Sequence, residues 1–201
     1  THTAAVDLPT TGVGTIGVTA STGYITMVGG TIYSTGSGTV TLLAATNVVL
    51  GEITTTSSAI NVTATAGAIT DATPAADTTT NLTSSGTATL VAATGIGASG
   101  AADIDTALGT LVATNNTSGD IYVQETNGLI IGGTGVRTLG GNGNINVDVT
   151  AGALDVNSVV TANGSGDVTL NAAGLLTVDA VVSSTTGDLS LTGGTGVTHT
   201  A

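Results

Sequence analysis

The stretch GDVTLNAAGLLTVDAVV, residues 166–182, recurs with small changes as GNINVDVTAGALDVNSVV at residues 143–160 and as GTVTLLAATNVVLGEI at residues 38–53. Each copy opens with Gly, places apolar residues at every second position, and then has a break of small residues before a second alternating pair. Alternation with a period of two indicates a β-strand. Each copy therefore predicts a strand, a bend, a second strand, another bend and a short third strand.

The same unit recurs eight times in the chain of 201 residues. The opening residues, which are spaced by 24, 20, 28, 33, 24, 23 and 21 positions, are Gly14, Gly38, Ser58, Gly86, Gly119, Gly143, Gly166 and Gly187. The first alternating pairs are Ile16/Val18, Val40/Leu42, Ile60/Val62, Ala88/Leu90, Ile121/Val123, Ile145/Val147, Val168/Leu170 and Leu189/Leu191. The second pairs are Ile25/Met27, Val48/Leu50, Ile96/Ala98, Leu129/Ile131, Leu154/Val156 and Leu176/Val178.

A unit of about 20 residues cannot bury its apolar face alone, but stacked units can cover one another. If each unit forms one turn of a coil, like strands pair in parallel and the inward Val, Ile and Leu side chains stack in columns. No helical periodicity competes with this pattern, and β-branched residues dominate the predicted strands. We therefore expect an all-β chain that forms a right-handed parallel β-helix of about 9 coils, each of roughly 20–24 residues.

The composition supports a thin interior built from small layers. Thr is the commonest residue, with 44 copies, and Gly contributes 31, whereas Phe, Trp and Cys are absent and only three Tyr occur. A compact core usually relies on large aromatic side chains, so this chain must build its interior from Val, Ile, Leu and Ala. The absence of Cys excludes a disulfide framework.

The charge balance excludes two classes of partner. Arg137 is the one Lys or Arg in the chain, and 13 carboxylates give a formal net charge of −12. Because binding to nucleic acids and to anionic membranes depends on Lys and Arg, we expect neither partner. No apolar run approaches the roughly 20 residues of a membrane-spanning helix, so no membrane insertion is expected. Divalent cations and cationic surfaces are compatible with this charge.

Two segments depart from the pattern and predict loops that protrude from the coil. DATPAADTTT, residues 71–80, contains Pro74 and two Asp, which are typical of a loop. The second loop is expected near residues 99–110, within the longest unit, which extends from Gly86 to the next opening residue, Gly119. This unit could contain an extra half-turn in which Leu108, Leu111 and Ala113 pack inward. The loops support an alternative function, a ligand-binding adhesin module that recognises a glycan or a protein.

The units GTVTLLAATNVVLG (38–51), GDVTLNAAGLLTVDA (166–180) and TSGDIYVQETNGLIIG (117–132) resemble the repeats of bacterial filamentous-haemagglutinin-type proteins and of related giant β-strand-repeat surface adhesins. The resemblance covers nearly the whole chain from Gly14 onward. It implies a right-handed parallel β-helix, an extracellular or cell-surface location, and a structural role in a fibre or adhesin shaft. The amino-terminal secretion domain of that family is not recognisable, which suggests an internal segment.

Some parallel β-helices are polysaccharide lyases or hydrolases, so a catalytic site is the remote alternative. Such lyases need a basic residue near acidic metal ligands, but Arg137 stands alone in GGTGVRTLGG, where a solvent-facing turn residue is expected. Glycosidases need two positioned carboxylates, and the pair Asp103 and Asp105 is better explained as the edge of a loop. We therefore assign no catalytic, cofactor-binding or metal-binding residue and expect no enzyme activity.

Three acidic residues follow opening glycines, and in a coil they fall in one column with Asn144. They are Asp120, Asp167 and Asp188. Gly followed by Asp or Asn is ordinary turn chemistry, which is the favoured interpretation. The alternative is a calcium site, because Asp167 and Asp188 would lie one turn apart. Thr-x-Thr pairs at Thr63/Thr65 and Thr87/Thr89 could suit an ice-binding ladder, but other units do not continue it.

The two ends of the chain share a tetrapeptide. THTA occupies residues 1–4 and 198–201, an offset of 197 positions, and these copies contain the two His of the chain. If the sequence restarted after this offset, the last unit would be as long as the units that open at Gly14 and Gly119. We therefore expect residues 1–201 to be a single solenoid segment, one period of a tandem array or one link of a filament, that associates end to end through its terminal coils.

Overall fold

The computed structural model of the chain describes residues 7–75 and 79–200. No helix is present among these residues and 53% of them are in strands, so the all-β prediction is confirmed. The strands are β1 (Leu8–Pro9), β2 (Ile16–Ala20), β3 (Ile25–Thr26), β4 (Ile32–Ser34), β5 (Val40–Ala44), β6 (Val48–Leu50), β7 (Glu52–Thr54), β8 (Ile60–Ala64), β9 (Ile69–Asp71), β10 (Leu82–Ala92), β11 (Ile104–Asn115), β12 (Ile121–Glu125), β13 (Leu129–Thr138), β14 (Ile145–Val149), β15 (Leu154–Val156), β16 (Val160–Ala162), β17 (Val168–Ala172), β18 (Leu175–Val178), β19 (Val182–Ser184), β20 (Leu189–Gly193) and β21 (Gly196–His199).

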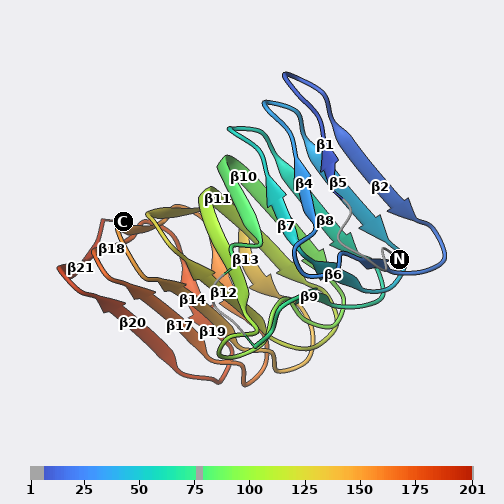
Figure 1. The fold of residues 1–201 in the computed structure, drawn as a ribbon. Coiled ribbons are helices and arrows are strands. Elements are labelled where there is room, and N and C mark those ends of the chain that lie inside the picture. The colour runs from blue at the N-terminus through green and yellow to red at the C-terminus, as the bar shows by residue number, and fades with distance from the viewer. Residues whose placement is uncertain (1–6, 76–78, 201) are drawn as a thin grey trace.

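The strands stack as a parallel β-solenoid of about eight turns, with the two ends of the chain at opposite ends of the stack (Figure 1). About nine coils were expected, and the described residues form about eight turns. The expected right-handed sense of the coil stays a prediction. No helix in the described part of the chain is long and apolar enough to cross a membrane.

Inward side chains form continuous columns, in which each residue lies beside its partner in the next turn. The first column consists of Val18, Leu42, Val62, Leu90, Ala113, Val136, Val160 and Val182. The second column consists of Ile25, Val48, Ile69, Ile96, Ile121, Ile145, Val168 and Leu189. The interior is therefore built from thin aliphatic layers, as the composition predicts.

A third column carries the two largest departures from this aliphatic interior. It consists of Leu8, Tyr33, Ile53, Leu82, Thr106, Glu125, Val149, Ala172 and Gly193. Tyr33 is 1% exposed and Glu125 is 0% exposed. The third column therefore buries a carboxyl group halfway along the solenoid.

The structure corrects the alignment of the units in the long stretch between Gly86 and Gly119. Leu90 lies beside Ala113 and not in the column of Val123, because β11 adds strand pairing that the opening glycines do not mark. Ile121 lies in the second column, beside Ile96 and Ile145. The five-residue strands consequently occupy the first column in β2, β5 and β8, but the second and third columns from β12 onward.

The two expected loops have different outcomes. The first, residues 71–80, is bounded by β9 and β10, and its residues 76–78 lie outside the described part of the chain. The second, near residues 99–110, is shorter than expected, because β11 begins at Ile104 and pairs with β10 over most of its length. Leu108, Leu111 and Ala113 are buried, as predicted. Inward packing of these side chains explains why the segment continues as a strand.

Candidate functional site

The last turn leaves core positions uncovered. In β17, Val168 is 0% exposed, whereas its partner in β20, Leu189, is 48% exposed. Val197 in β21 is 38% exposed although its partner in the turn before, Leu176, is buried. These side chains continue inward columns, so their exposure reflects the end of the stack and not an outward orientation. The C-terminal face of the described solenoid is therefore an open layer of its core.

The column of acidic residues forms a ladder of hydrogen bonds. The backbone N–H of Asn144 donates to Oδ1 of Asp120 (2.7 Å), that of Asp167 donates to Oδ1 of Asn144 (2.8 Å), and that of Asp188 donates to Oδ1 of Asp167 (2.8 Å). Each side chain thus accepts the N–H of the next turn at the corner. The geometry agrees with the turn interpretation of these residues. Within residues 7–75 and 79–200, no group of three or more His, Cys, Asp and Glu side chains is placed to hold a metal ion.

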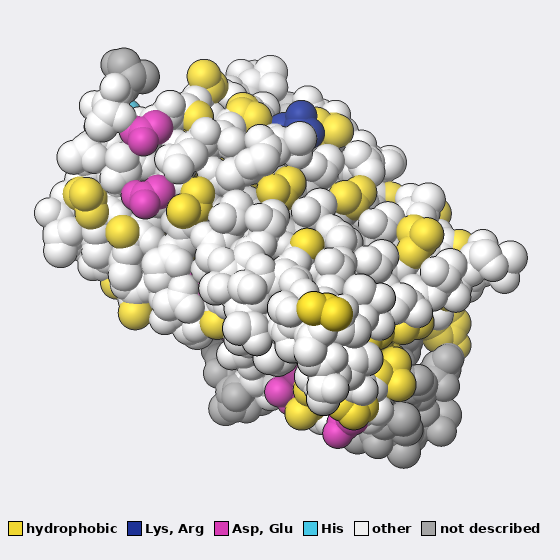
Figure 2. All heavy atoms as spheres, turned by 90° about the horizontal axis from the view of Figure 1, so that it is seen from above, with side chains coloured by type: hydrophobic (Ala, Val, Ile, Leu, Met, Phe, Trp, Pro, Cys, Tyr) yellow, Lys and Arg dark blue, Asp and Glu magenta, His cyan; other side chains and the backbone are white. Residues whose placement is uncertain are grey.

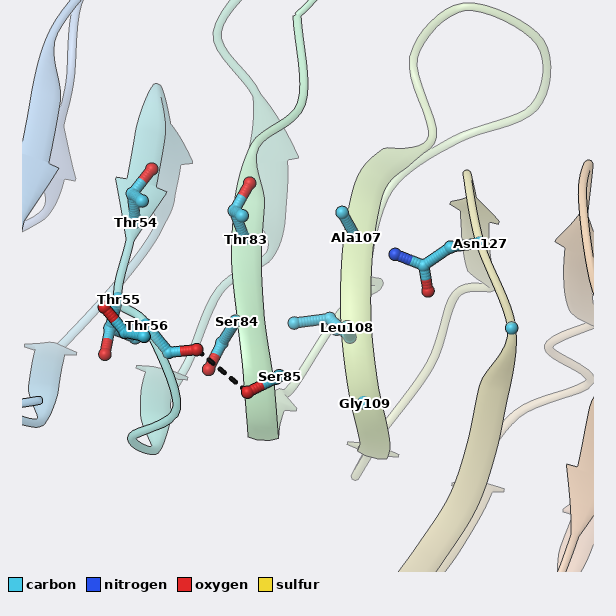
Figure 3. Close-up of a pocket in the computed structure, with 11 residues that line it drawn as sticks. Thr54, Thr55, Thr56, Thr83, Ser84, Ser85, Ala107, Leu108, Gly109 and Asn127 are labelled. Atoms are coloured by element: carbon cyan, nitrogen blue, oxygen red, sulfur yellow. Dashed lines mark hydrogen bonds between the residues drawn. The ribbon is translucent and has the colours of Figure 1, made fainter.

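A groove of about 450 Å³ crosses the side of the solenoid over four neighbouring turns (Figure 3). Thr54, Thr83 and Ala107 lie side by side in its row of aligned strands. Its remaining lining residues are Thr55, Thr56, Ser84, Ser85, Leu108, Gly109, Asn127 and Gly128. The hydroxyl of Ser85 donates to the carbonyl oxygen of Thr56 (2.9 Å). Hydroxyl and amide groups with no charged lining residue suit hydrogen bonding to a neutral polar ligand.

Glu125 lies beneath this groove and holds the neighbouring chain segments together. Its Oε2 accepts hydrogen bonds from Oγ1 of Thr106 (2.8 Å) and from the backbone N–H of Leu108 (2.9 Å). Its Oε1 accepts one from the backbone N–H of Asn127 (3.0 Å). Burial raises the pKa of the Glu125 carboxyl above its ordinary value of 4.5, and these hydrogen bonds offset part of the rise. The carboxylate is therefore a structural acceptor enclosed in the core.

Sequence analysis did not identify Glu125, although the signal was present. The alternation that places Ile121 and Val123 inward continues to Glu125, two residues later on the same face of β12. Burial also raises the pKa of the Tyr33 phenol, which belongs to the same column. Asp120, Asp167 and Asp188 lie at turns, whereas the burial of Glu125 follows from the strand period.

The residues considered for catalysis lie in different places. Arg137 is in β13, with Thr114 and Thr161 as its neighbours in adjacent turns, so the expectation of a turn residue was wrong. The residues on either side of it point inward, which places Arg137 on the outer face. Asp103 precedes β11, and Asp105 lies within it, where its backbone N–H donates to Oδ1 of Asn81 (3.0 Å).

Figure 2 shows a face dominated by backbone and by side chains that are neither hydrophobic nor charged, with hydrophobic side chains in scattered spots, a few acidic side chains and one small cationic area. The Thr pairs considered for ice binding do not form a common ladder, because Thr63 lies beside Val91 and Thr89 lies beside Asn61. The open end layer and the lateral groove are therefore the two surface features that best suit an interaction.

The comparisons with known proteins give no relative. No protein-family model, no curated protein and no solved structure matches this chain.

Proposed function

We propose that the chain is a structural segment of an extracellular fibre or of an adhesin shaft, built by stacking of its coils and without catalysis. The observation that carries the proposal is the uncovered core layer at the C-terminal end, where Leu189 and Val197 continue buried columns. Another coil stacked on this layer would remove apolar surface from water at about 25 cal/mol per Å². It would also pair the open strand edges, which otherwise invite uncontrolled association.

The surface and the repeat sequence support this role. The chain forms about eight stacked turns, and each turn contributes a similar length to a rod. The net charge of −12 and the polar outer face keep such a rod soluble along its sides. The resemblance of the repeats to filamentous-haemagglutinin-type proteins motivates the extracellular location.

Fusions of two and three copies test the proposal. We join the copies so that Ala201 is followed directly by Ala5 of the next copy, which preserves the offset between the two THTA tetrapeptides. Electron microscopy and small-angle X-ray scattering should show unbranched rods that lengthen by about 40 Å with each added copy, as expected for turns spaced by roughly 4.8 Å. Compact particles, or lengths that do not increase with copy number, would contradict a shaft function.

The lateral groove favours a second candidate, a binding module for a neutral glycan. Thr and Ser residues from neighbouring turns line it, and Thr83 lies between Thr54 and Ala107 in the aligned row. On a glycan array, binding by the native chain should be lost in Thr83→Trp, which fills the groove. Thr169→Trp, an outward position on β17, should bind like the native chain. Failure of the native chain to bind any glycan would reject this candidate.

A further inference from the structure

We infer that the open C-terminal turn binds the N-terminal turn of a second copy of this chain in one register. In this register, β19, β20 and β21 pair in parallel with β1, β2 and β3 of the next copy. The inference rests on the proposed structural function and specifies its partner and its contacts. It requires each terminal strand to meet a strand of matching length and matching inward residues.

The longest strands of the two end turns match in length and pattern. β20 and β2 have five residues each, and both place their first, third and fifth residues toward the interior. Leu189 then lies beside Ile16 and Leu191 beside Val18. In the alternative register, the second column of one copy continues into the second column of the next copy. The five-residue β20 then lies over the two-residue β3, which leaves strand positions unpaired. The register that joins β20 to β2 therefore buries more of the open layer.

The other two sides agree with the same register. Val182 of β19 then lies beside Leu8 of β1, and Val197 of β21 lies beside Ile25 of β3. In a chain continued with the offset between the two THTA tetrapeptides, each of these partners follows one turn later. Each of these three separations along the chain is longer than the shortest turn of the first column, which extends from Leu42 to Val62. Each is also shorter than the longest turn of that column, which extends from Val62 to Leu90. Every side thus gives an ordinary turn length.

The corners of the end turns are also alike. Gly187 lies directly over the carbonyl oxygen of Gly166, and Gly38 lies in the same way over that of Gly14. The register places Gly14 of the next copy over Gly187, which continues this close backbone stacking. A corner hydroxyl precedes both glycines: Oγ of Ser184 accepts the N–H of Gly187 (2.8 Å), and the hydroxyl of Thr10 donates to the carbonyl oxygen of Gly14 (2.8 Å).

The acidic ladder supplies one directed contact across the junction. Asp167 accepts the N–H of Asp188 in the following turn, so Asp188, the last member, is positioned to accept the N–H of Thr15 in the next copy. Val168 donates its N–H to the carbonyl oxygen of Asp188 (2.9 Å), and Leu189 would donate to that of Thr15 in the same way. These two hydrogen bonds fix the register beyond what apolar contact alone specifies.

Sedimentation of the 201-residue chain tests the interface. The native chain should form end-to-end oligomers as its concentration rises. Leu189→Asp places a carboxylate in the buried layer and should weaken association on the order of a hundredfold or more. Ser190→Asp adds the same charge on the outer face of the same strand and should leave association close to native. A native chain that stays monomeric at all concentrations, or equal effects of the two variants, would overturn the inference.

Disulfide trapping tests the register, and the absence of native Cys makes it specific. Thr192 and Thr19 are partners on the outer face in the inferred register, at about 4.8 Å between Cα atoms. Oxidation of Thr192→Cys/Thr19→Cys should give a covalent ladder of oligomers on a non-reducing gel. The control Thr192→Cys/Gly17→Cys lies two residues out of register, at about 8 Å, beyond the roughly 7 Å that a disulfide spans.

The outcomes of the trapping experiment separate the two proposals. A strong ladder from the in-register pair and a weak one from the control support the inferred pairing of β20 with β2. Equal ladders, or a stronger ladder from the control, overturn the register. If the fused copies still lengthen as rods in that case, the shaft function stands and the junction uses another register.

Discussion

Glu125 is the residue whose position is least expected from its chemistry. It stands in a column between Thr106 and Val149, fully buried. Its two oxygens accept hydrogen bonds from β11 and from the bend after β12. At this level of the stack, the five-residue strands change from the first column to the second and third columns. Without these oxygens, the N–H of Leu108 would lose its partner, and an unsatisfied buried donor costs about 1–3 kcal/mol. Glu125 therefore positions the irregular centre of the solenoid.

The raised pKa of Glu125 predicts a specific pH dependence of stability. Because the folded state binds the proton more tightly than the unfolded state, the contribution of this group to the free energy of unfolding grows as the pH falls through the folded pKa. The gain is complete below the ordinary value of 4.5. Glu125→Gln removes this titration, so the native chain should gain stability relative to the variant as the pH falls from about 8 to about 4.

Denaturant unfolding of both chains across this pH range measures the difference between their free energies of unfolding. The titration of the other carboxyl groups affects both chains and largely cancels in this difference. A difference that stays constant, or that changes in favour of the variant at low pH, would show that the carboxyl does not titrate as its burial requires.

At the scale of the element, the corners depend on backbone stacking that admits no side chain. Gly143 lies over Gly119, and a Cβ at Gly143 would collide with the carbonyl oxygen of Gly119. Gly166 repeats the arrangement over Gly143. The opening glycine of each of these units is therefore required by the close approach of two turns.

Substitution at two glycines distinguishes the effect of this close contact from the general effect of replacing a glycine in a strand by alanine. Gly143→Ala should destabilise the chain by about 2–3 kcal/mol or more, because a backbone carbonyl cannot move aside as a side chain can. Gly17→Ala meets nothing within 4 Å in β2 and should be neutral or stabilising by up to about 1 kcal/mol. Thermal or denaturant unfolding measures both. Equal effects would show that the turns do not stack at Gly143.

The elements also show what the sequence could and could not predict. Alternation and small-residue breaks correctly predict the inward residues of most strands, because burial on one face imposes a period of two. The stacking partners near the centre were assigned wrongly, because Leu111/Ala113 and Ile121/Val123 have the same alternation and each pair follows a Gly at the same spacing, Gly109 and Gly119, of which only Gly119 was taken as an opening residue. Register depends on contacts between turns, and a local pattern does not distinguish two equivalent pairs.

At the scale of the whole molecule, stability is distributed along the stack. Each turn contacts the turns before and after it, so the interior needs only side chains that repeat well in columns. Val, Ile, Leu and Ala meet this need without Phe or Trp. The composition therefore predicts the thin core, whereas the open layer at the C-terminal end and the lateral groove depend on which strands end where, and these required the structure.

The exchange of columns in the middle of the chain has a consequence for a fibre assembled in the inferred register. The five-residue strands lie in the first column in β2, β5 and β8 and span the second and third columns from β12 to β20. Because β20 would pair with β2 of the next copy, each copy would be turned about the fibre axis relative to the copy before it. The grooves of successive copies would then face different directions around the fibre and not lie along a single line.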